Sequence, residues 1–495
     1  MKFTNLIFSL SIIILIAADS TAQSQCPPVY TFTGEEVDDR FGFSVASAGD
    51  VNNDGFDDII VGAWSNDAGG FSAGRAYVFS GQTGDTLYVF TGEAAGDWFG
   101  WSVASAGDVN SDGFVDLIVG AWRNDAGGEF AGRAYVLSGQ TGDTIYVFTG
   151  EAAYAFFGWS VASAGDVNND GFDDLIVGAN GNDAGGNNAG RAYVFSGQTG
   201  DTIYVFTGEA AEDNFGGSVA SAGDVNNDGF DDLIVGANGN DAGGTSAGRA
   251  YVFSGQTGDT IYVFTGEAVG EQFGRQVASA GDVNNDGFAD LIVGVPFNDA
   301  GGFDAGRACV FSGQTGDKIY TFTGEAANDF FGFSVASAGD LNNDGFDDLI
   351  VGANGNDAGG NGAGRAYVFS GQTGDKIYVL TGETAGDAFG SSVASVGDLN
   401  NDGFDDLIVG APATDAGRAY VFSPCGFRGD VNYDGKDANI LDLTFLVDFI
   451  FRGGTEAACL EEADVNGDGD SADILDLTFL VDFIFRGGPP PGVCH

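Results

Sequence analysis

A nine-residue acidic loop in this chain has the side chains that a hard metal cation needs. Its first copy places Asp50, Asn52 and Asp54 at alternate positions, follows them with a glycine, and closes on Asp58. Oxygen-bearing side chains at the first, third and fifth positions can converge on one point, and the glycine permits a sharp turn. The backbone carbonyl of Phe56 and the carboxylate of Asp58 would complete the shell. Hard oxygen ligands in such a loop favour calcium over zinc or copper, so we predict a calcium site here.

The loop occurs seven times in the same register, which makes a chance pattern a poor explanation. The alternative is that the acidic residues only cap turns, but the spacing fits a calcium loop better. The aspartate before the ninth position, Asp57 in the first copy, is Val115 and Ala289 in two others, so we exclude it. In the same order, the predicted ligands of the other six copies are Asp108, Asn110, Asp112, Phe114 and Asp116; Asp166, Asn168, Asp170, Phe172 and Asp174; Asp224, Asn226, Asp228, Phe230 and Asp232; Asp282, Asn284, Asp286, Phe288 and Asp290; Asp340, Asn342, Asp344, Phe346 and Asp348; and Asp398, Asn400, Asp402, Phe404 and Asp406.

The elements that must position these loops repeat with the same period. The dipeptide Phe-Gly occurs seven times between Phe41 and Phe389, each copy 58 residues after the one before. Turn residues separate four β-like runs in each copy. In the first copy we expect strands over 43–48, 58–62, 75–80 and 87–91. A period of this length with four short strands predicts the blades of a seven-bladed β-propeller and a mainly β fold.

The ends of the repeat array indicate how the ring closes. The last copy stops after 418–423 and lacks a fourth strand, whereas an extra copy of that strand opens the chain at 30–34. We expect the N-terminal strand to complete the last blade, which would leave no open sheet edge. Cys26 and Cys425 lie just outside these two strands, so a disulfide between them could lock the closure. Cys309 stands where other copies have tyrosine, and we interpret it as a buried thiol.

Three elements together resemble the FG-GAP repeats of integrin α-chain propellers over residues 29–423. They are the Phe-Gly pair, the acidic loop, and a Gly-Ala-Pro element that reads in full at 410–412. In most copies the third element departs from that pattern, for example as Gly-Ala-Trp at Gly62 and Gly120. The resemblance implies a seven-bladed propeller with a role in adhesion or ligand binding.

Five tryptophans mark one rim of the predicted propeller. Because strands alternate in direction, the loops joining first to second and third to fourth strands share one face, and the remaining loops share the other. The acidic loops lie on the first face, and all the tryptophans fall on the second. As a candidate ligand-binding patch for a protein or glycan we take Trp64, Trp98, Trp101, Trp122 and Trp159. The alternative is that they pack between blades or line the top of the channel.

A different unit follows at residues 425–495, in two copies 34 residues apart. Each has an acidic loop and then a run with helical apolar spacing, at 440–452 and 474–486. The pair resembles a type I dockerin, an α-helical, EF-hand-like module, which implies up to two more calcium ions and a cohesin-like partner. The closing carboxylate falls one residue late, so coordination is expected to differ from the usual loop. The candidate ligands are Asp430, Asn432, Asp434 and Asp442, then Asp464, Asn466, Asp468, Asp470 and Asp476; Cys459 and Cys494 are candidates for a disulfide.

Charge and the first residues indicate where the protein acts. The chain has 72 acidic and 17 basic residues and a formal net charge of −55, which excludes nucleic acid and anionic membrane surfaces as partners. Residues 1–22 have the basic start, apolar run and small-residue end of a signal peptide. No later stretch is long and apolar enough to insert in a membrane. We therefore expect a secreted or cell-surface protein with about seven calcium ions in its propeller.

Catalytic machinery is sparse in this sequence. The only histidine is His495, and no zinc motif occurs. The leading hypothesis is a recognition or adhesion protein, not an enzyme, whose C-terminal module attaches it to an extracellular assembly. The first alternative is a matrix or surface-layer component without a specific ligand. The second is part of a polysaccharide hydrolase, because carboxylate pairs can cleave glycosidic bonds.

Overall fold

The computed structural model describes residues 28–342, 344–400 and 403–423, and, further along the chain, Leu443, Leu446, Val447, Ile450, residues 477–481 and Ile484. Several sequence predictions fall outside these residues. They are the signal peptide at 1–22, the pairings of Cys26, Cys425, Cys459 and Cys494, the ligand Asp402, and all the candidate ligands between Asp430 and Asp476. Of the helical residues that are described, none belongs to a helix long and apolar enough to cross a membrane.

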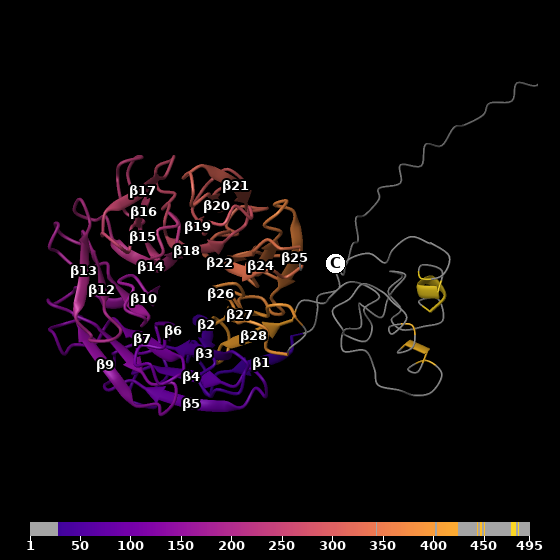
Figure 1. The fold of residues 1–495 in the computed structure, drawn as a ribbon, viewed down its shortest axis with the longest axis horizontal. Helices are drawn as coiled ribbons and strands as arrows, with labels where there is room; N and C mark the ends of the chain where they lie inside the picture. Colours follow the sequence, from indigo (N-terminus) through magenta and orange to yellow (C-terminus); the bar gives the residue numbers. More distant parts are fainter. Residues whose placement is uncertain are drawn as a thin grey trace, which may run out of the picture.

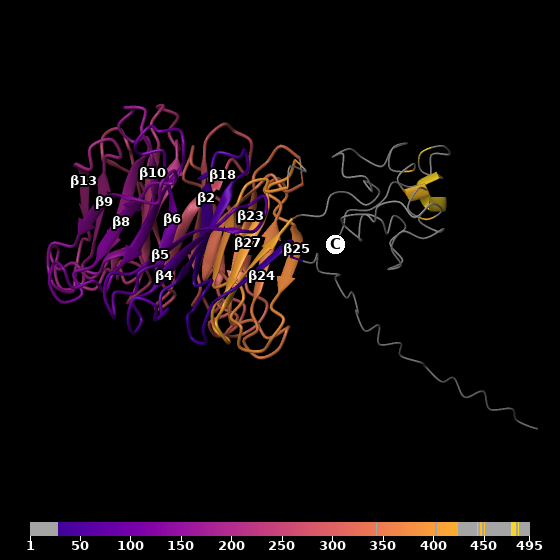
Figure 2. The ribbon, with the colours of Figure 1, turned by 90° about the horizontal axis from the view of Figure 1, so that it is seen from below.

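Twenty-eight strands form seven four-stranded antiparallel sheets around a central axis (Figure 1). Seen from the side, the strands run between the two faces of the ring (Figure 2). The strands are β1 (Tyr30–Thr33), β2 (Ser44–Gly49), β3 (Asp58–Ala63), β4 (Arg75–Phe79), β5 (Thr86–Thr91), β6 (Ser102–Gly107), β7 (Asp116–Ala121), β8 (Arg133–Leu137), β9 (Thr144–Thr149), β10 (Phe157–Gly165), β11 (Asp174–Ala179), β12 (Arg191–Phe195), β13 (Thr202–Thr207), β14 (Phe215–Gly223), β15 (Asp232–Ala237), β16 (Arg249–Phe253), β17 (Thr260–Thr265), β18 (Gln276–Gly281), β19 (Asp290–Val295), β20 (Arg307–Phe311), β21 (Lys318–Thr323), β22 (Ser334–Gly339), β23 (Asp348–Ala353), β24 (Arg365–Phe369), β25 (Lys376–Thr381), β26 (Ser392–Ser395), β27 (Leu407–Ala411) and β28 (Arg418–Phe422).

The predicted seven-bladed propeller is confirmed. Blade one contains β2 to β5 in sequence order, and blades two to six repeat this arrangement. Blade seven has the order β1-β28-β27-β26, with Tyr30 opposite Val421 and Thr33 opposite Arg418. The chain therefore closes its ring by pairing its first strand with its last. The observed strands of blade one end within one residue of the predicted ranges.

The core lies between neighbouring blades. The second strand of each blade is buried along its described length, as in β3, because a sheet on either side covers both of its faces. One cluster joins Ile60 and Val78 of blade one to Leu117 and Val119 of blade two. Six further clusters join the other neighbouring pairs in the same way. The ring is thus one apolar unit in which each blade needs both neighbours.

The glycines of the repeat are required where two blades meet. Gly100, in the Phe-Gly pair of blade two, has φ +84°, and an added Cβ would lie 2.1 Å from the carbonyl oxygen of Arg75 in blade one. Gly62, which opens the third motif element of blade one, would place a Cβ 2.0 Å from the carbonyl oxygen of Gly100. Because both approaches are between backbones, no side chain can move aside to make room. The two motif elements of this repeat therefore specify how closely blades pack.

Replacing Gly100 with alanine should destabilise the propeller by about 3 kcal/mol or more, because it combines backbone strain with a backbone clash. Gly96 provides a matched control, since its φ is +87° and no atom lies within 4 Å of an added Cβ. We expect Gly96→Ala to cost about 1 kcal/mol from the backbone strain alone. Chemical denaturation of both variants in calcium measures the difference. Equal losses would contradict the steric account.

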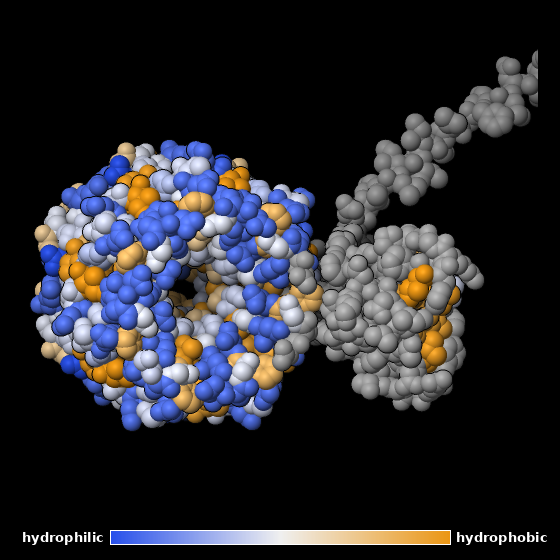
Figure 3. Space-filling view, viewed as in Figure 1, coloured by the Kyte–Doolittle hydropathy of each residue, from blue (hydrophilic) through white to orange (hydrophobic). Residues whose placement is uncertain are grey.

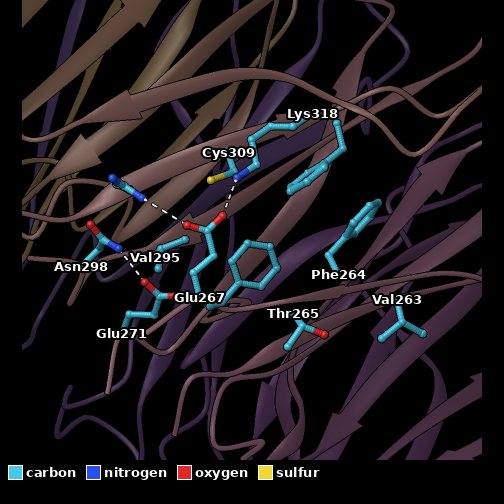
Figure 4. Close-up of a pocket in the computed structure, with 12 residues that line it drawn as sticks. Val263, Phe264, Thr265, Glu267, Glu271, Val295, Asn298, Cys309 and Lys318 are labelled. Atoms are coloured by element: carbon cyan, nitrogen blue, oxygen red, sulfur yellow. Dashed lines mark hydrogen bonds and ion pairs between the residues drawn. The ribbon is translucent and has the colours of Figure 1, made fainter. Parts of the chain in front are cut away.

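A cavity of about 250 Å³ lies between blades four and five and is lined by Phe264, Glu267, Glu271 and Cys309 (Figure 4). The cavity lies where the other six blades place a tyrosine, such as Tyr251 in blade four. Cys309 is buried and its thiol is free, as the sequence indicated. Glu271 stands where most blades have aspartate, and its carboxylate accepts a hydrogen bond from Asn298 Nδ2 at 2.5 Å. The longer acid partly compensates for the missing ring.

Restoring the pattern of the other blades with Cys309→Tyr and Glu271→Asp together should raise the free energy of unfolding by about 1–2 kcal/mol, because the ring fills the cavity. Guanidinium denaturation in calcium checks this. Cys309→Ser, which changes polarity but not size, is the control and should not stabilise. A double variant less stable than the parent chain would show that blade five has repacked around the cysteine.

Candidate calcium loops and recognition rim

The acidic loops lie between the first and second strands of their blades, and their described residues repeat one hydrogen-bond pattern. In blade one, the Asp50 carboxylate accepts hydrogen bonds from the backbone N–H groups of Asp54 and Gly55 at 3.0 and 2.9 Å. The bond from the glycine N–H recurs in all seven loops at 2.8–3.0 Å. The loop therefore folds tightly around the first-position carboxylate.

The ninth-position aspartate joins two loops on the same face. Asp58 is fully buried, and its carboxylate accepts hydrogen bonds from Val51 N–H at 3.1 Å and Gly81 N–H at 3.0 Å. Gly81 lies in the turn between β4 and β5, so this side chain holds that turn against the acidic loop. The equivalent bond from the turn glycine occurs in blades two to six. This structural role is additional to the ligand role predicted from spacing.

In blades one to six, the ninth-position carboxyl has an unfavourable environment for its ionised form. Burial, and to a smaller degree the charges of Asp54 and Asp50, raise the pKa of Asp58 to about 7, although bonds from Gly81 and Val51 oppose the shift. The same causes raise the pKa of the equivalent aspartates to about 7 in blades two to six: Asp116, Asp174, Asp232, Asp290 and Asp348. A cation in the loop would remove this repulsion.

The side chains present fit a calcium ion. The Oδ1 atoms of Asn52 and Asn284, both at the third position, are buried and accept no hydrogen bond from the described residues. The Nδ2 atom of Asn52 lies 3.4 Å from Asp58, which leaves the oxygen of the amide available to a cation. An oxygen in this position is one that a hard cation would bind.

Acidic side chains alone do not form a ready-made cage. Within residues 28–342, 344–400 and 403–423, no three aspartate, glutamate, histidine or cysteine side chains converge as a metal site. Two members of each predicted ligand set are an amide oxygen and a backbone carbonyl, and the first carboxylate is turned toward backbone N–H groups. The predicted ligands thus lie in one turn of each loop without converging, and their role as ligands stays a prediction.

The structure also shows a set of contacts that spacing did not reveal. The residue before the ninth position reaches the acidic loop of the preceding blade. Asp173 of blade three accepts the N–H of Asp108 in blade two at 3.2 Å, and Asp347 of blade six accepts that of Asp282 at 2.7 Å. Burial, together with nearby acidic residues, raises the pKa of Asp173. The only sequence signal of this role is that the position before the ninth is aspartate in five copies and another residue in two.

The five tryptophans form one contiguous cluster over blades one to three. Ring centroids lie 4.2 Å apart for Trp64 and Trp98, 5.5 Å for Trp98 and Trp101, and 5.0 Å both for Trp101 and Trp159 and for Trp122 and Trp159. All five are half-buried. They therefore pack on one another across neighbouring blades, Trp101 and Trp159 also line the central channel, and part of each ring is exposed to solvent.

Other side chains extend this cluster. Phe43 adds a ring 4.5 Å from Trp101 at the channel side, and Phe156 adds one 5.0 Å from Trp122. The guanidinium of Arg123 lies 4.3 Å from the centroid of Trp98. Phe43 and Arg123 had no distinguishing sequence signal, because their contacts depend on which loops adjoin. We call the five tryptophans with Phe43, Phe156 and Arg123 the aromatic rim.

The seven sheets and their loops define a β-propeller built from one repeated unit. The FG-GAP repeat family matches residues 41–79, 99–137, 157–195, 215–253, 273–311, 331–369 and 389–422, and the chain belongs to this family. It is 35% identical over 232 residues to integrin alpha-5 of Xenopus laevis, an alignment that covers 43% of this chain and 21% of that protein. It is 31% identical over 232 residues to integrin alpha-V of Gallus gallus, covering 43% and 22%. It is 32% identical over 198 residues to integrin alpha-PS5 of Drosophila melanogaster, covering 36% and 19%. The aligned part is thus about a fifth of each relative.

Proposed function

We propose that this protein is a calcium-binding recognition or adhesion protein that acts outside the cell or at its surface. The observation that carries the proposal is the aromatic rim, a half-buried surface of eight side chains on one face of a rigid FG-GAP ring. Aromatic rings and arginine are the groups that most often anchor a bound protein or glycan. Membership of a repeat family that includes parts of integrin α chains agrees with this role.

Calcium has a structural part in the proposal. Seven loops with about one ion each would neutralise buried carboxylates on the face opposite the rim. The ions would hold the loops and the inter-blade aspartates in place, and so keep the rim in one shape. Recognition then needs calcium without any contact between ion and ligand.

The C-terminal segment is proposed to attach the protein to an extracellular assembly, with a cohesin-like partner. Support comes from the few residues described there. Leu446 and Leu480, which occupy equivalent positions of the two copies, are buried in one cluster with Leu443, Ile450 and Leu477. Helical residues of the two copies therefore pack against each other, as a duplicated module requires. Export by the segment at 1–22 is part of the same proposal.

Binding of the full chain to arrays of extracellular proteins and glycans, in calcium, tests the recognition role. We expect a saturable ligand whose affinity falls at least tenfold when Trp101 and Trp122 are both changed to alanine. Phe303→Ala is the matched control, since Phe303 is an aromatic side chain on the same face, in blade five, and 67% exposed. Equal unfolding midpoints show that the variants are folded. A ligand held equally by the parent chain and the tryptophan variant would contradict the proposal, as would the absence of any saturable ligand.

A further inference from the structure

The central channel of the propeller is lined by a ring of residues that differ from blade to blade. The seven innermost strands surround a cavity of about 230 Å³, which opens at the hollow in the middle of the ring (Figure 3). The residue after each Phe-Gly pair lines this cavity. In blade order these residues are Phe43, Trp101, Trp159, Gly217, Arg275, Phe333 and Ser391. A repeat that is otherwise nearly constant thus presents seven mostly different side chains to the channel.

Arg275 is the one basic residue in the described part of the chain that has neither an ion pair nor close aromatic stacking. Ten of the other described basic residues lie within 4.0 Å of a carboxylate. Arg123 stacks on Trp98 and Phe130 at 4.3 and 4.5 Å. The Arg275 guanidinium lies 5.7 Å from the centroid of the Phe333 ring. In a chain with 72 acidic residues, an arginine in a channel without an acid beside it is unusual.

The surroundings of Arg275 favour an anion. Burial lowers the pKa of its guanidinium, and no neighbouring acid opposes that effect. Arg275 is half-buried in the channel and has no carboxylate partner among the described residues, so an anion that pairs with its guanidinium would gain a charge-assisted hydrogen bond. A carboxylate can accept two parallel hydrogen bonds from a guanidinium.

Blade five departs from the other blades at the next position too. In blade three, Ser160 Oγ accepts the backbone N–H of Val219 in the following blade at 3.1 Å. The same inter-blade bond is made by Ser44, Ser102, Ser218 and Ser392. Blade five has Gln276 in place of this serine. Arg275 and Gln276, at the start of β18, thus present longer polar side chains to the channel than the other blades do. The serine hydrogen bond to the next blade is lost in exchange.

A row of aromatic rings and a set of amides lie in the same part of the molecule as Arg275, around the channel. Phe43, Trp101 and Trp159 form a continuous row, with centroids 4.5 and 5.0 Å apart. Gly217 leaves a gap in the ring of side chains between Trp159 and Arg275. Asn238 Oδ1 and Asn180 Nδ2 lie 3.3 and 3.9 Å from where a Cβ on Gly217 would be. The gap is therefore bounded by an aromatic ring, amide groups and a guanidinium.

We propose that this channel mouth binds one acidic sugar residue of a glycan, with its carboxylate on Arg275, its ring against Trp159 and its hydroxyls on the amides of Asn180 and Asn238. The inference rests on the proposed recognition function and names the ligand class. Aromatic faces pack on the C–H faces of sugar rings, amides suit hydroxyl pairs, and the guanidinium is specific for the carboxylate. A net charge of −55 repels polyanions, so we expect a glycan with a single acidic sugar among neutral ones.

The test uses the full chain in calcium and four singly charged tetrasaccharides, which end in glucuronate, galacturonate, mannuronate or N-acetylneuraminate. Each is paired with its carboxyl-reduced counterpart, and titration calorimetry measures affinity. We expect at least one acid to bind saturably and its reduced counterpart to bind about tenfold or more weakly. Arg275→Gln should make the two affinities equal, and Gly217→Phe should abolish binding by filling the gap. Arg249→Gln, which removes an arginine paired with Glu209, is the charge control and should change neither affinity.

Two results would overturn the inference. One is that no acid binds better than its reduced counterpart. The other is that the preference persists in Arg275→Gln. Failure of this inference can be told apart from failure of the proposed function. If a ligand found on the arrays depends on Trp101 and Trp122 but not on Arg275, the recognition role stands and only the channel site is removed.

Discussion

Stripping calcium from the full chain should lower its unfolding midpoint by about 20 °C. A ligand present at a hundred times its dissociation constant stabilises the folded state by about 2.7 kcal/mol per site, so seven sites in one ring contribute on the order of 19 kcal/mol. The sites act together because every apolar cluster of the propeller joins two blades. For roughly 400 folded residues, the unfolding entropy corresponds to about 0.8 kcal/mol per degree. Thermal unfolding by circular dichroism, with calcium and after chelation, measures the shift.

Single-loop variants show whether the stabilisation is spread around the ring. Asp228→Ala, at the fifth position of the blade-four loop, should lower the midpoint in calcium by about 3 °C, a seventh of the whole effect. The matched control is Asp259→Ala, an exposed aspartate in another turn of the same blade, which should have little effect. A midpoint that does not respond to chelation would contradict structural calcium in these loops.

Calcium affinity should fall about tenfold per site between pH 8 and pH 6. The ninth-position aspartates of blades one to six have pKa values raised to about 7 in the absence of metal, chiefly by burial. Below pH 7 a proton therefore competes with the ion, whereas at pH 8 the carboxylates are already ionised. Calcium binding should release about one proton per site at pH 6 and about a tenth of a proton at pH 8. Calorimetry in two buffers of different ionisation enthalpy counts these protons.

Stability of the metal-free chain should have the opposite pH dependence from that of ordinary paired carboxylates. Because the folded-state pKa of about 7 lies above the ordinary value of 3.8, the folded chain binds more protons than the unfolded chain between about pH 4 and pH 7. Metal-free protein should therefore lose stability as pH rises through this window, and saturating calcium should remove the loss. Denaturation of the metal-free protein at pH 5, 6, 7 and 8 checks the direction. A stability that rises over this range would contradict the burial argument.

The repeat could be predicted from the sequence because the glycines that mark it are required for steric reasons. Gly62 and Gly100 are needed where two backbones meet, so the motif occurs wherever one blade contacts the next. The closing strand was predictable because the last copy lacks one strand and the chain begins with it. The grouping of the tryptophans followed from strand direction alone.

The rest depends on which loops adjoin in space. Asp173 is a loop contact only because blade three lies against the acidic loop of blade two. The spacing predicted only a ligand role for Asp58, yet its carboxylate also accepts a hydrogen bond from the turn at Gly81. Arg275 had no periodic signal, and its meaning comes from a channel that seven blades enclose. Long-range contacts of this kind have no local pattern in a single sequence.

Counting calcium tests the central claim most directly. The full chain, loaded with calcium and passed through gel filtration, can be analysed by atomic emission for ions bound per molecule. Seven intact loops predict at least seven ions per chain, and the C-terminal pair could raise the count to nine. Two or fewer would contradict the account, because the loops would then be acidic turns and the buried aspartates would need another explanation.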